Sequence, residues 1–230
     1  MKSCELILAL DMGSRDEALN LLKEIGPDLK WVKLGLQMFT AHGPDWVREV
    51  AGLGFNIFLD LKLHDIPNTV AKTVQSLSHL PIGMLTIHSC GGVEMMAAAN
   101  QVRLHQKPDL LLLGVTVLTS MDEQQLRRVG VPATPPGQVH NLASAVVESG
   151  VPGLVCSAKE LHLLAPEFGK QLQFVTPGIR PLGSSADDQK RVVTPGQAAA
   201  SGSNYIVVGR PIYKAESPRE AVRAINMELA

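Results

Sequence analysis

Short apolar runs alternate with longer amphipathic stretches along the whole chain, and this alternation restricts the fold more than any other feature. The runs are nearly continuous in Leu, Ile and Val, which is typical of parallel strands that are buried on both faces. The stretches between them begin with helix-capping residues such as Ser14, Thr194 and Ser217. The runs cover Leu6–Leu10, Trp31–Leu34, Phe55–Leu61, Met84–His88, Leu110–Leu118, Leu154–Cys156, Gln173–Thr176 and Tyr205–Val208.

Eight such runs with helices between them predict a closed parallel sheet, which is a single (β/α)8 TIM barrel of the α/β class. An open doubly wound sheet is the alternative, but it usually carries a GxGxxG turn after its first strand. Here the first run is followed by Asp11-Met12-Gly13-Ser14 instead. No linker-like or low-complexity segment divides the chain, so we expect residues 1–230 to form one barrel domain.

The charge balance argues against two classes of partner. The formal net charge is −1, and no segment is dense in Lys or Arg, so we expect neither a nucleic acid nor a membrane surface as partner. The longest apolar run is far shorter than a membrane span, and the N-terminal run is too short for a signal-peptide core. Cys4, Cys90 and Cys156 are odd in number and widely spaced, which is typical of reduced thiols in the cytoplasm.

Ionisable residues stand where the predicted strands end, and barrel chemistry is located at the carboxyl ends of the strands. Asp11 follows the first run, Lys33 lies on the second, and Asp60 and Lys62 close the third, with Asp65 just beyond. Side chains alternate along a strand, so Asp60 and Lys62 point the same way and need charged partners. We predict an alternating chain of charges made of Lys33, Asp60, Lys62 and Asp65. A purely structural ion-pair network would produce the same pattern, but the strand-end location favours a functional site.

The loops after the seventh and eighth runs predict a phosphate site. In barrels these two loops commonly bind phosphate, and here they contain Gly178-Ile179-Arg180 and Gly209-Arg210-Pro211. Glycine allows backbone N–H groups to approach an anion, and arginine supplies a planar fork of donors. Between them, Pro181–Arg191 is rich in Gly, Ser and Asp and lacks an apolar pattern. We expect this segment to be a mobile loop that closes over a ligand.

The segment Asp60–Thr69 reads DLKLHDIPNT and resembles the DxKxHDIPNT signature of the orotidine 5′-monophosphate decarboxylases. The pattern DxKxxD alone is shared with related sugar-phosphate lyases, whereas the full stretch together with TPGIRP is highly specific. The resemblance covers nearly the whole chain in family order. The other matching segments are Leu8–Asp11, Lys33–Gly35, Val117–Ser120, Thr176–Pro181 and Val208–Ile212.

The resemblance implies a cofactor-free decarboxylation of orotidine 5′-monophosphate to UMP and CO₂ in pyrimidine biosynthesis. Its catalytic set would be Lys62, Asp60, Asp65 and Lys33. Lys62 would supply the proton that replaces CO₂, and Asp60 would lie beside the substrate carboxylate. The family pattern also implies a homodimer with shared active sites, in which Asp65 and Thr69 reach into the site of the other subunit.

The same resemblance implies where the rest of the substrate binds. Asp11 and Lys33 would hold the ribose hydroxyls, and Thr119 and Ser120 would lie by the pyrimidine. Around the phosphate the resemblance places Arg180, Gln189, Gly209 and Arg210.

The sequence leaves two alternative functions. His64 and His88 lack the spacing of a metal motif, so we expect no metal ligands. The sequence contains no cofactor motif, so we also expect no cofactor. The nearest alternative is a metal-dependent sugar-phosphate decarboxylase or aldolase of the same barrel group, and the stretch from His64 to Thr69 speaks against it. The second alternative is a catalytically silent phosphate-binding barrel, and the presence of both Asp60 and Lys62 argues against it.

Overall fold

The computed structural model describes residues 4–181 and 193–230. Within these ranges, eight parallel strands pair in chain order and close on themselves, which confirms the predicted (β/α)8 barrel. The predicted loop lies outside the described residues from position 182 onward, and so does Gln189. The strands are β1 (Glu5–Ala9), β2 (Trp31–Gly35), β3 (Asn56–Leu63), β4 (Met84–His88), β5 (Leu111–Val115), β6 (Gly153–Val155), β7 (Gln173–Thr176) and β8 (Tyr205–Val208).

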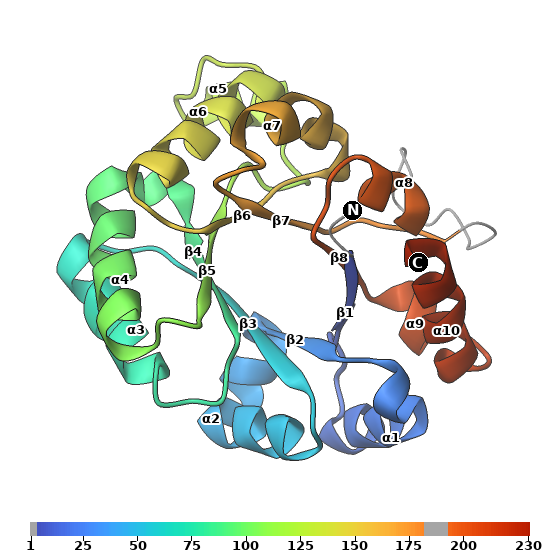
Figure 1. The fold of residues 1–230 in the computed structure, drawn as a ribbon. Coiled ribbons are helices and arrows are strands. Elements are labelled where there is room, and N and C mark those ends of the chain that lie inside the picture. Colours follow the sequence, from blue (N-terminus) through green and yellow to red (C-terminus); the bar gives the residue numbers. More distant parts are fainter. Residues whose placement is uncertain (1–3, 182–192) are drawn as a thin grey trace.

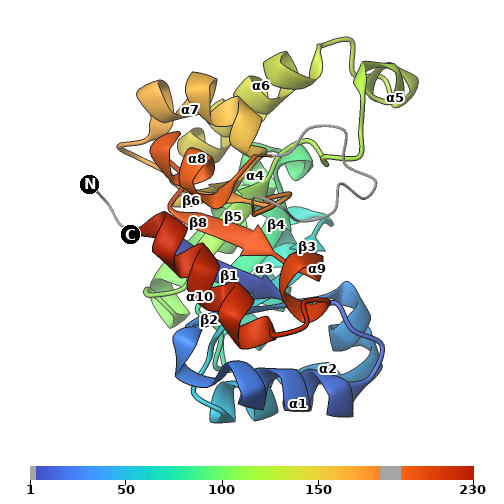
Figure 2. The same ribbon diagram turned by 90° about the vertical axis from the view of Figure 1, so that its right-hand side faces the viewer.

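Helices surround the strands as an outer ring, seen along the barrel in Figure 1. In Figure 2 the arrowheads of β1 and β8 point toward α9, while α10 ends beside the starts of these strands. The α-helices are α1 (Arg15–Ile25), α2 (Leu36–Gly52), α3 (Pro67–Leu77), α4 (Gly92–Gln106), α5 (Glu123–Arg128), α6 (Pro135–Glu148), α7 (Leu161–Phe168), α8 (Pro195–Ala200), α9 (Arg210–Tyr213) and α10 (Pro218–Leu229). Single 3-10 turns are η1 (Gly26–Asp28), η2 (Ser89–Gly91) and η3 (Ala158–Glu160).

The predicted helix starts are confirmed by their caps. The Ser14 side chain accepts a hydrogen bond from the backbone N–H of Glu17 at the start of α1. Thr194 caps α8 and Ser217 caps α10 in the same way, each followed by a proline at the first helical turn. Proline has no backbone N–H to lose there, and its φ already suits the helix.

The alternation of side chains along each strand divides the core into two layers. Inside the barrel, Ile7 and Phe58 pack with Met84, Leu113 and Val175. The residues between them on each strand point outward and bury their side chains against the helices. The inner layer fills the barrel below its mouth, so any site must lie at one of its ends.

One strand is shorter than its apolar run. The run from Leu110 to Leu118 was predicted as a strand, but β5 ends at Val115. Val117 and Leu118 instead line a cavity at the mouth of the barrel, so their apolar character serves that cavity. Apolar composition alone does not separate a residue in the sheet from one that lines a mouth.

Candidate active site

A cavity of about 200 Å³ occupies the mouth at the carboxyl ends of the strands. One part of its wall is charged and carries Lys33, Asp60 and Lys62. The remainder is mostly apolar, which is the usual composition of a small-molecule site. Its other lining residues are Phe58, Val115, Val117, Leu118, Thr119, Val155, Cys156, Val175, Pro177 and Val207.

Four charged side chains of alternating sign meet at this wall. Lys62 Nζ lies 2.9 Å from Oδ1 and 3.0 Å from Oδ2 of Asp60. Lys33 Nζ lies 3.5 Å from Asp60 Oδ2 and 3.2 Å from Asp11 Oδ1. Asp60 and Lys33 are both 9% exposed, so these charges have little water to solvate them. Asp11 is exposed, and the formal charges of the four side chains cancel, which lowers the cost of burying Asp60 and Lys33.

Asp60 is held in its ionised form. Burial alone would raise the pKa of its carboxyl, but the charges of Lys33 and Lys62 and the hydrogen bonds from Lys62 and Thr86 outweigh burial. The pKa of Asp60 therefore lies below its ordinary value. An ionised Asp60 in turn favours the charged ammonium of Lys62, because each group stabilises the charge of the other.

The backbone departs from a regular strand at Lys62. Its φ is +50°, and among the described residues it is the one non-glycine with a positive φ. The register between β3 and β4 also shifts here, since Leu59 pairs with Leu85 and Leu63 with Ile87. The side chains of Lys62 and Asp60 do lie together as expected, and they do so where the pairing between β3 and β4 is irregular. Backbone strain of this kind gathers at functional sites.

Asp65 does not join the charge chain that the sequence analysis predicted. It is exposed, its Oδ1 accepts a hydrogen bond from the N–H of Ile66 at 2.7 Å, and no described residue forms an ion pair with it. Asp11 takes the fourth place, next to Lys33. The physical reason is that Asp65 lies in the turn beyond β3, whereas Asp11 follows β1, which pairs directly with the strand β2 that carries Lys33. Thr69 is likewise exposed, on the first turn of α3.

The candidate phosphate residues meet near the ends of β7 and β8. Arg180 is 8% exposed, and its Nη1 donates to the carbonyl of Ile179. Arg210 begins α9 directly after Gly209. Burial first, and then the charge of Asp11, raise the pKa of the Tyr213 hydroxyl, while Arg210 and Arg180 act in the opposite direction. Both arginines are therefore close enough to influence one hydroxyl at this corner.

Of the two residues predicted beside the pyrimidine, Thr119 lines the mouth cavity and Ser120 is not among its lining residues, and both are exposed.

Three residues at the site were missed by the sequence analysis. Thr86 is fully buried on β4 and contacts both Asp60 and Lys62. A Cβ on Gly35 would lie 3.0 Å from Lys33 Nζ and 3.1 Å from Asp11 Oδ1, so the glycine leaves room for that ion pair. Tyr213 lies at the phosphate corner. The available signal for Thr86 was a polar residue between apolar neighbours, inside a run whose other polar residue is the terminal His88.

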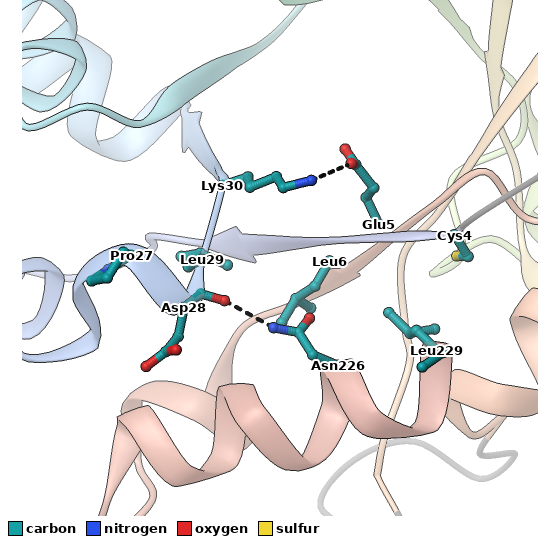
Figure 3. A pocket seen from close by; sticks show the side chains of 10 residues that line it. Cys4, Glu5, Leu6, Pro27, Asp28, Leu29, Lys30, Asn226 and Leu229 are labelled. Atoms are coloured by element: carbon teal, nitrogen blue, oxygen red, sulfur yellow. Dashed lines mark hydrogen bonds and ion pairs between the residues drawn. The ribbon is translucent and has the colours of Figure 1, made fainter.

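A second cavity, of about 290 Å³, lies at the opposite end of the barrel between the start of β1, η1 and α10 (Figure 3). Its polar side chains are already paired. Lys30 donates to Glu5, and Asn226 donates to the backbone carbonyl of Asp28. The Asp28 carboxylate meets Arg219 and Arg223. Groups that satisfy one another in this way are typical of structural packing, so we assign no chemistry to this cavity.

The described ranges 4–181 and 193–230 contain no cluster of three or more His, Cys, Asp or Glu residues arranged to hold a metal ion. His64 and His88 lie with ring centroids 5.5 Å apart, and Cys90 Sγ is 2.9 Å from His88 Nδ1. In the same described residues, no helix is long and apolar enough to span a membrane.

Known proteins match this chain over nearly its whole length. Residues 5–225 match the family described as "Orotidine 5'-phosphate decarboxylase / HUMPS family". A curated protein named orotidine 5'-phosphate decarboxylase from Opitutus terrae is 53% identical over 227 residues, which cover 99% of each chain. One of the same name from Pseudoalteromonas translucida is 47% identical over 99% of this chain and 98% of the relative. A crystal structure of orotidine 5'-phosphate decarboxylase from Lactobacillus acidophilus superposes with a TM-score of 0.88 at 36% identity, covering 98% of this chain and 99% of that one.

Proposed function

The chain belongs to the orotidine 5′-phosphate decarboxylase / HUMPS family, and from this premise we propose that it converts orotidine 5′-monophosphate to UMP and CO₂. One observation carries the proposal. The Lys62 ammonium lies against both oxygens of a buried Asp60, at the edge of a largely apolar cavity. The curated relatives at 53% and 47% identity bear the decarboxylase name, and the comparisons do not support the sugar-phosphate alternative.

The reaction needs a cation beside the carbon that loses CO₂. Cleavage of the bond between C6 and the carboxylate leaves an electron pair in the plane of the pyrimidine ring, where the π system cannot delocalise it. A fixed ammonium stabilises this developing charge and then transfers a proton to C6. Lys62 would do both, and its neutral amine would regain a proton from water after the product leaves.

Asp60 and Lys33 would prepare Lys62 for that step. The two Asp60 oxygens hold the Lys62 ammonium in place, and Lys33 lies between Asp60 and Asp11 and balances the second of these two negative charges. A substrate carboxylate near Asp60 would be repelled by about 4 kcal/mol if the two charges lay ~4 Å apart at an effective dielectric constant of ~20. Departure of neutral CO₂ removes that repulsion, which favours the forward reaction.

The rest of the substrate would be held by groups around the mouth. Asp11 and Lys33 suit the ribose hydroxyls, and Thr119 suits the pyrimidine, with Ser120 nearby in the chain. Arg180, Gly209 and Arg210 suit the phosphate, to which we add Gln189 from outside the described residues. Binding energy from a phosphate remote from C6 is available to lower the barrier.

We further propose a homodimer in which Asp65 and Thr69 complete the site of the other subunit. Both residues are exposed, and neither is held by an ion pair among the described residues. Ile66 between them is 66% exposed, so this turn also presents an apolar side chain that the other subunit would cover in such a dimer. In a two-fold dimer the interface is isologous, so each subunit would lend its Asp65 to the other.

Two smaller proposals complete this account. We propose that residues 1–230 act as one barrel domain, consistent with the family match over residues 5–225. The three cysteines are free, and two of them are buried, which supports a location in the reducing cytoplasm.

The direct test measures the loss of ultraviolet absorbance of orotidine 5′-monophosphate with purified protein, with and without EDTA. We expect turnover that survives EDTA, and loss of turnover in a folded Lys62→Ala variant. Activity of that variant within about tenfold of wild type, a barrier difference of only ~1.4 kcal/mol, would remove Lys62 from its assigned role. Loss of wild-type activity on chelation, restored by Mg²⁺, would favour the sugar-phosphate alternative instead.

The shared site has its own test. Lys62→Ala and Asp65→Ala homodimers should each be nearly inactive. After subunit exchange of equal amounts, about half of the dimers are mixed, and one of the two sites in each mixed dimer combines an intact Lys62 with an intact Asp65. Roughly one site in four should therefore recover. If exchange is complete by mass spectrometry and activity stays at the sum of the parents, Asp65 serves its own subunit.

A further inference from the structure

Thr86 lies at the centre of the charged wall without being one of its charges. It is on β4, fully buried, and on the same face of the strand as Met84, which packs inside the barrel. Its hydroxyl lies 2.8 Å from the backbone nitrogen of Lys62 and 2.9 Å from Asp60 Oδ1. It therefore contacts the backbone of one proposed catalytic residue and the side chain of the other.

The directions of these two hydrogen bonds follow from the chemistry of the groups. The Lys62 N–H can only donate, so the Thr86 oxygen accepts from it. The Asp60 carboxylate is ionised and can only accept, so the single hydroxyl hydrogen of Thr86 is donated to Oδ1. No other residue type of this size supplies an acceptor and a donor on one atom, apart from serine.

These contacts form a closed ring of interactions that includes the Lys62 ammonium. The ring runs from the Lys62 N–H to Thr86, on to Asp60 Oδ1, and back to Lys62 through its Nζ at 2.9 Å. The Lys62 side chain is thereby tied to its own backbone through Thr86 and Asp60. A long side chain with several rotatable bonds gains positional order from such a closed arrangement.

Thr86 also supports the irregular backbone at Lys62. Between the paired positions Leu59–Leu85 and Leu63–Ile87, β3 has three residues where β4 has only Thr86. The Lys62 N–H thus finds a side-chain hydroxyl where a regular ladder would offer a carbonyl. This bond stabilises Lys62 in a left-handed conformation, with φ of +50°, that lysine rarely adopts.

We infer that Thr86 is a positioning residue of this site, which sets the place of the Lys62 ammonium through one bond to its backbone and one to Asp60. The inference rests on the proposed function for its effect on turnover. It does not rest on that function for the hold of Thr86 on the Lys62 backbone, which can be measured separately.

The experiment compares Thr86→Val, Thr86→Ser and Thr116→Val. Valine keeps the shape and removes the hydroxyl, whereas serine keeps the hydroxyl. Thr116 is the matched control because it is also fully buried, and its hydroxyl donates to the backbone carbonyl of Val155 and not to a charged side chain. For each variant we would measure kcat, the affinity for UMP, and the hydrogen-exchange rate of the Lys62 amide.

Thr86→Val should lower kcat roughly 10- to 100-fold, the range expected for loss of a hydrogen bond to a charged group. UMP lacks the carboxylate that reacts, so its affinity should change less than about threefold, and Thr86→Ser and Thr116→Val should keep kcat within about threefold. The Lys62 amide should exchange at least about tenfold faster in Thr86→Val alone. If Thr86→Val is not recovered folded, Thr86→Cys serves in its place, because a thiol is a weak donor and acceptor.

Two results would overturn the inference: a kcat of Thr86→Val within about threefold of wild type, or an equal loss in Thr116→Val, which would indicate general packing damage. If the wild-type protein does not decarboxylate orotidine 5′-monophosphate, the proposed function fails by itself. Exchange at Lys62 then decides the structural half, and an unchanged rate in Thr86→Val would refute it.

Discussion

The conformation of Lys62 leads to a prediction that reverses the usual ranking of two substitutions. Lys62→Gly should be more stable than Lys62→Ala, although alanine is normally the less costly replacement. With φ at +50°, any residue that has a Cβ is strained by about 1–2 kcal/mol, and glycine avoids this strain. Glycine loses about 0.5–1 kcal/mol more backbone entropy on folding. The balance favours the glycine variant by ~0.5–1 kcal/mol.

The comparison isolates the backbone because both variants lose the same ammonium. Each leaves Asp60 with Lys33 as its remaining cation, at 3.5 Å, so the electrostatic cost is shared and cancels in the difference. For a chain of this size, ~1 kcal/mol corresponds to a shift in Tm of about 2–4 °C. Urea unfolding and calorimetry would resolve this difference if the dependence on urea is the same for both variants. Neither variant should turn over substrate.

Lys72 supplies the matched control. It is exposed within α3, where glycine costs about 1 kcal/mol relative to alanine. Lys72→Gly should therefore be less stable than Lys72→Ala, the opposite order from position 62. If the alanine variant is the more stable one at both positions by the same margin, Lys62 does not occupy the left-handed region and carries no backbone strain.

Three further perturbations test other parts of the site. Arg210→Ala should lower kcat/KM for orotidine 5′-monophosphate by a factor that corresponds to at most several kcal/mol of transition-state stabilisation, and should leave kcat/KM for the phosphate-free nucleoside nearly unchanged. Equal losses on both substrates would show that Arg210 does not contact the phosphate. Gly35→Ala should lower kcat/KM by about tenfold or more, since its Cβ would crowd Lys33 Nζ at 3.0 Å, whereas Gly13→Ala, with nothing within 4 Å of its Cβ, should not. The pKa of Asp60 is lowered in the folded state, so its contribution to stability is present above its unfolded value and is lost as the pH falls through the folded value. The urea midpoint should therefore drop more steeply below about pH 4 in wild type than in Asp60→Asn, and parallel curves would contradict this.

Local sequence patterns determined the architecture because strand burial and helix caps are short-range properties. Buried parallel strands require continuous apolar residues, and the predicted runs Met84–His88, Gln173–Thr176 and Tyr205–Val208 agree with the observed strands residue for residue. The strand-end positions of Lys33, Asp60 and Lys62 were also visible, since a barrel brings all of its carboxyl ends to one mouth. The family resemblance then supplied the proposed roles.

Only the tertiary structure decided which groups touch. The sequence placed Asp65 in the charge chain because it follows Lys62 closely, yet Asp11 occupies that place from the far side of β2. Thr86 could not be predicted as a contact, because its two bonds depend on a register shift between β3 and β4. The left-handed backbone of Lys62 depends on the same shift. Pairing between strands is set by packing across the whole barrel, so the register shift and the contacts that depend on it cannot be predicted from a local pattern in the chain.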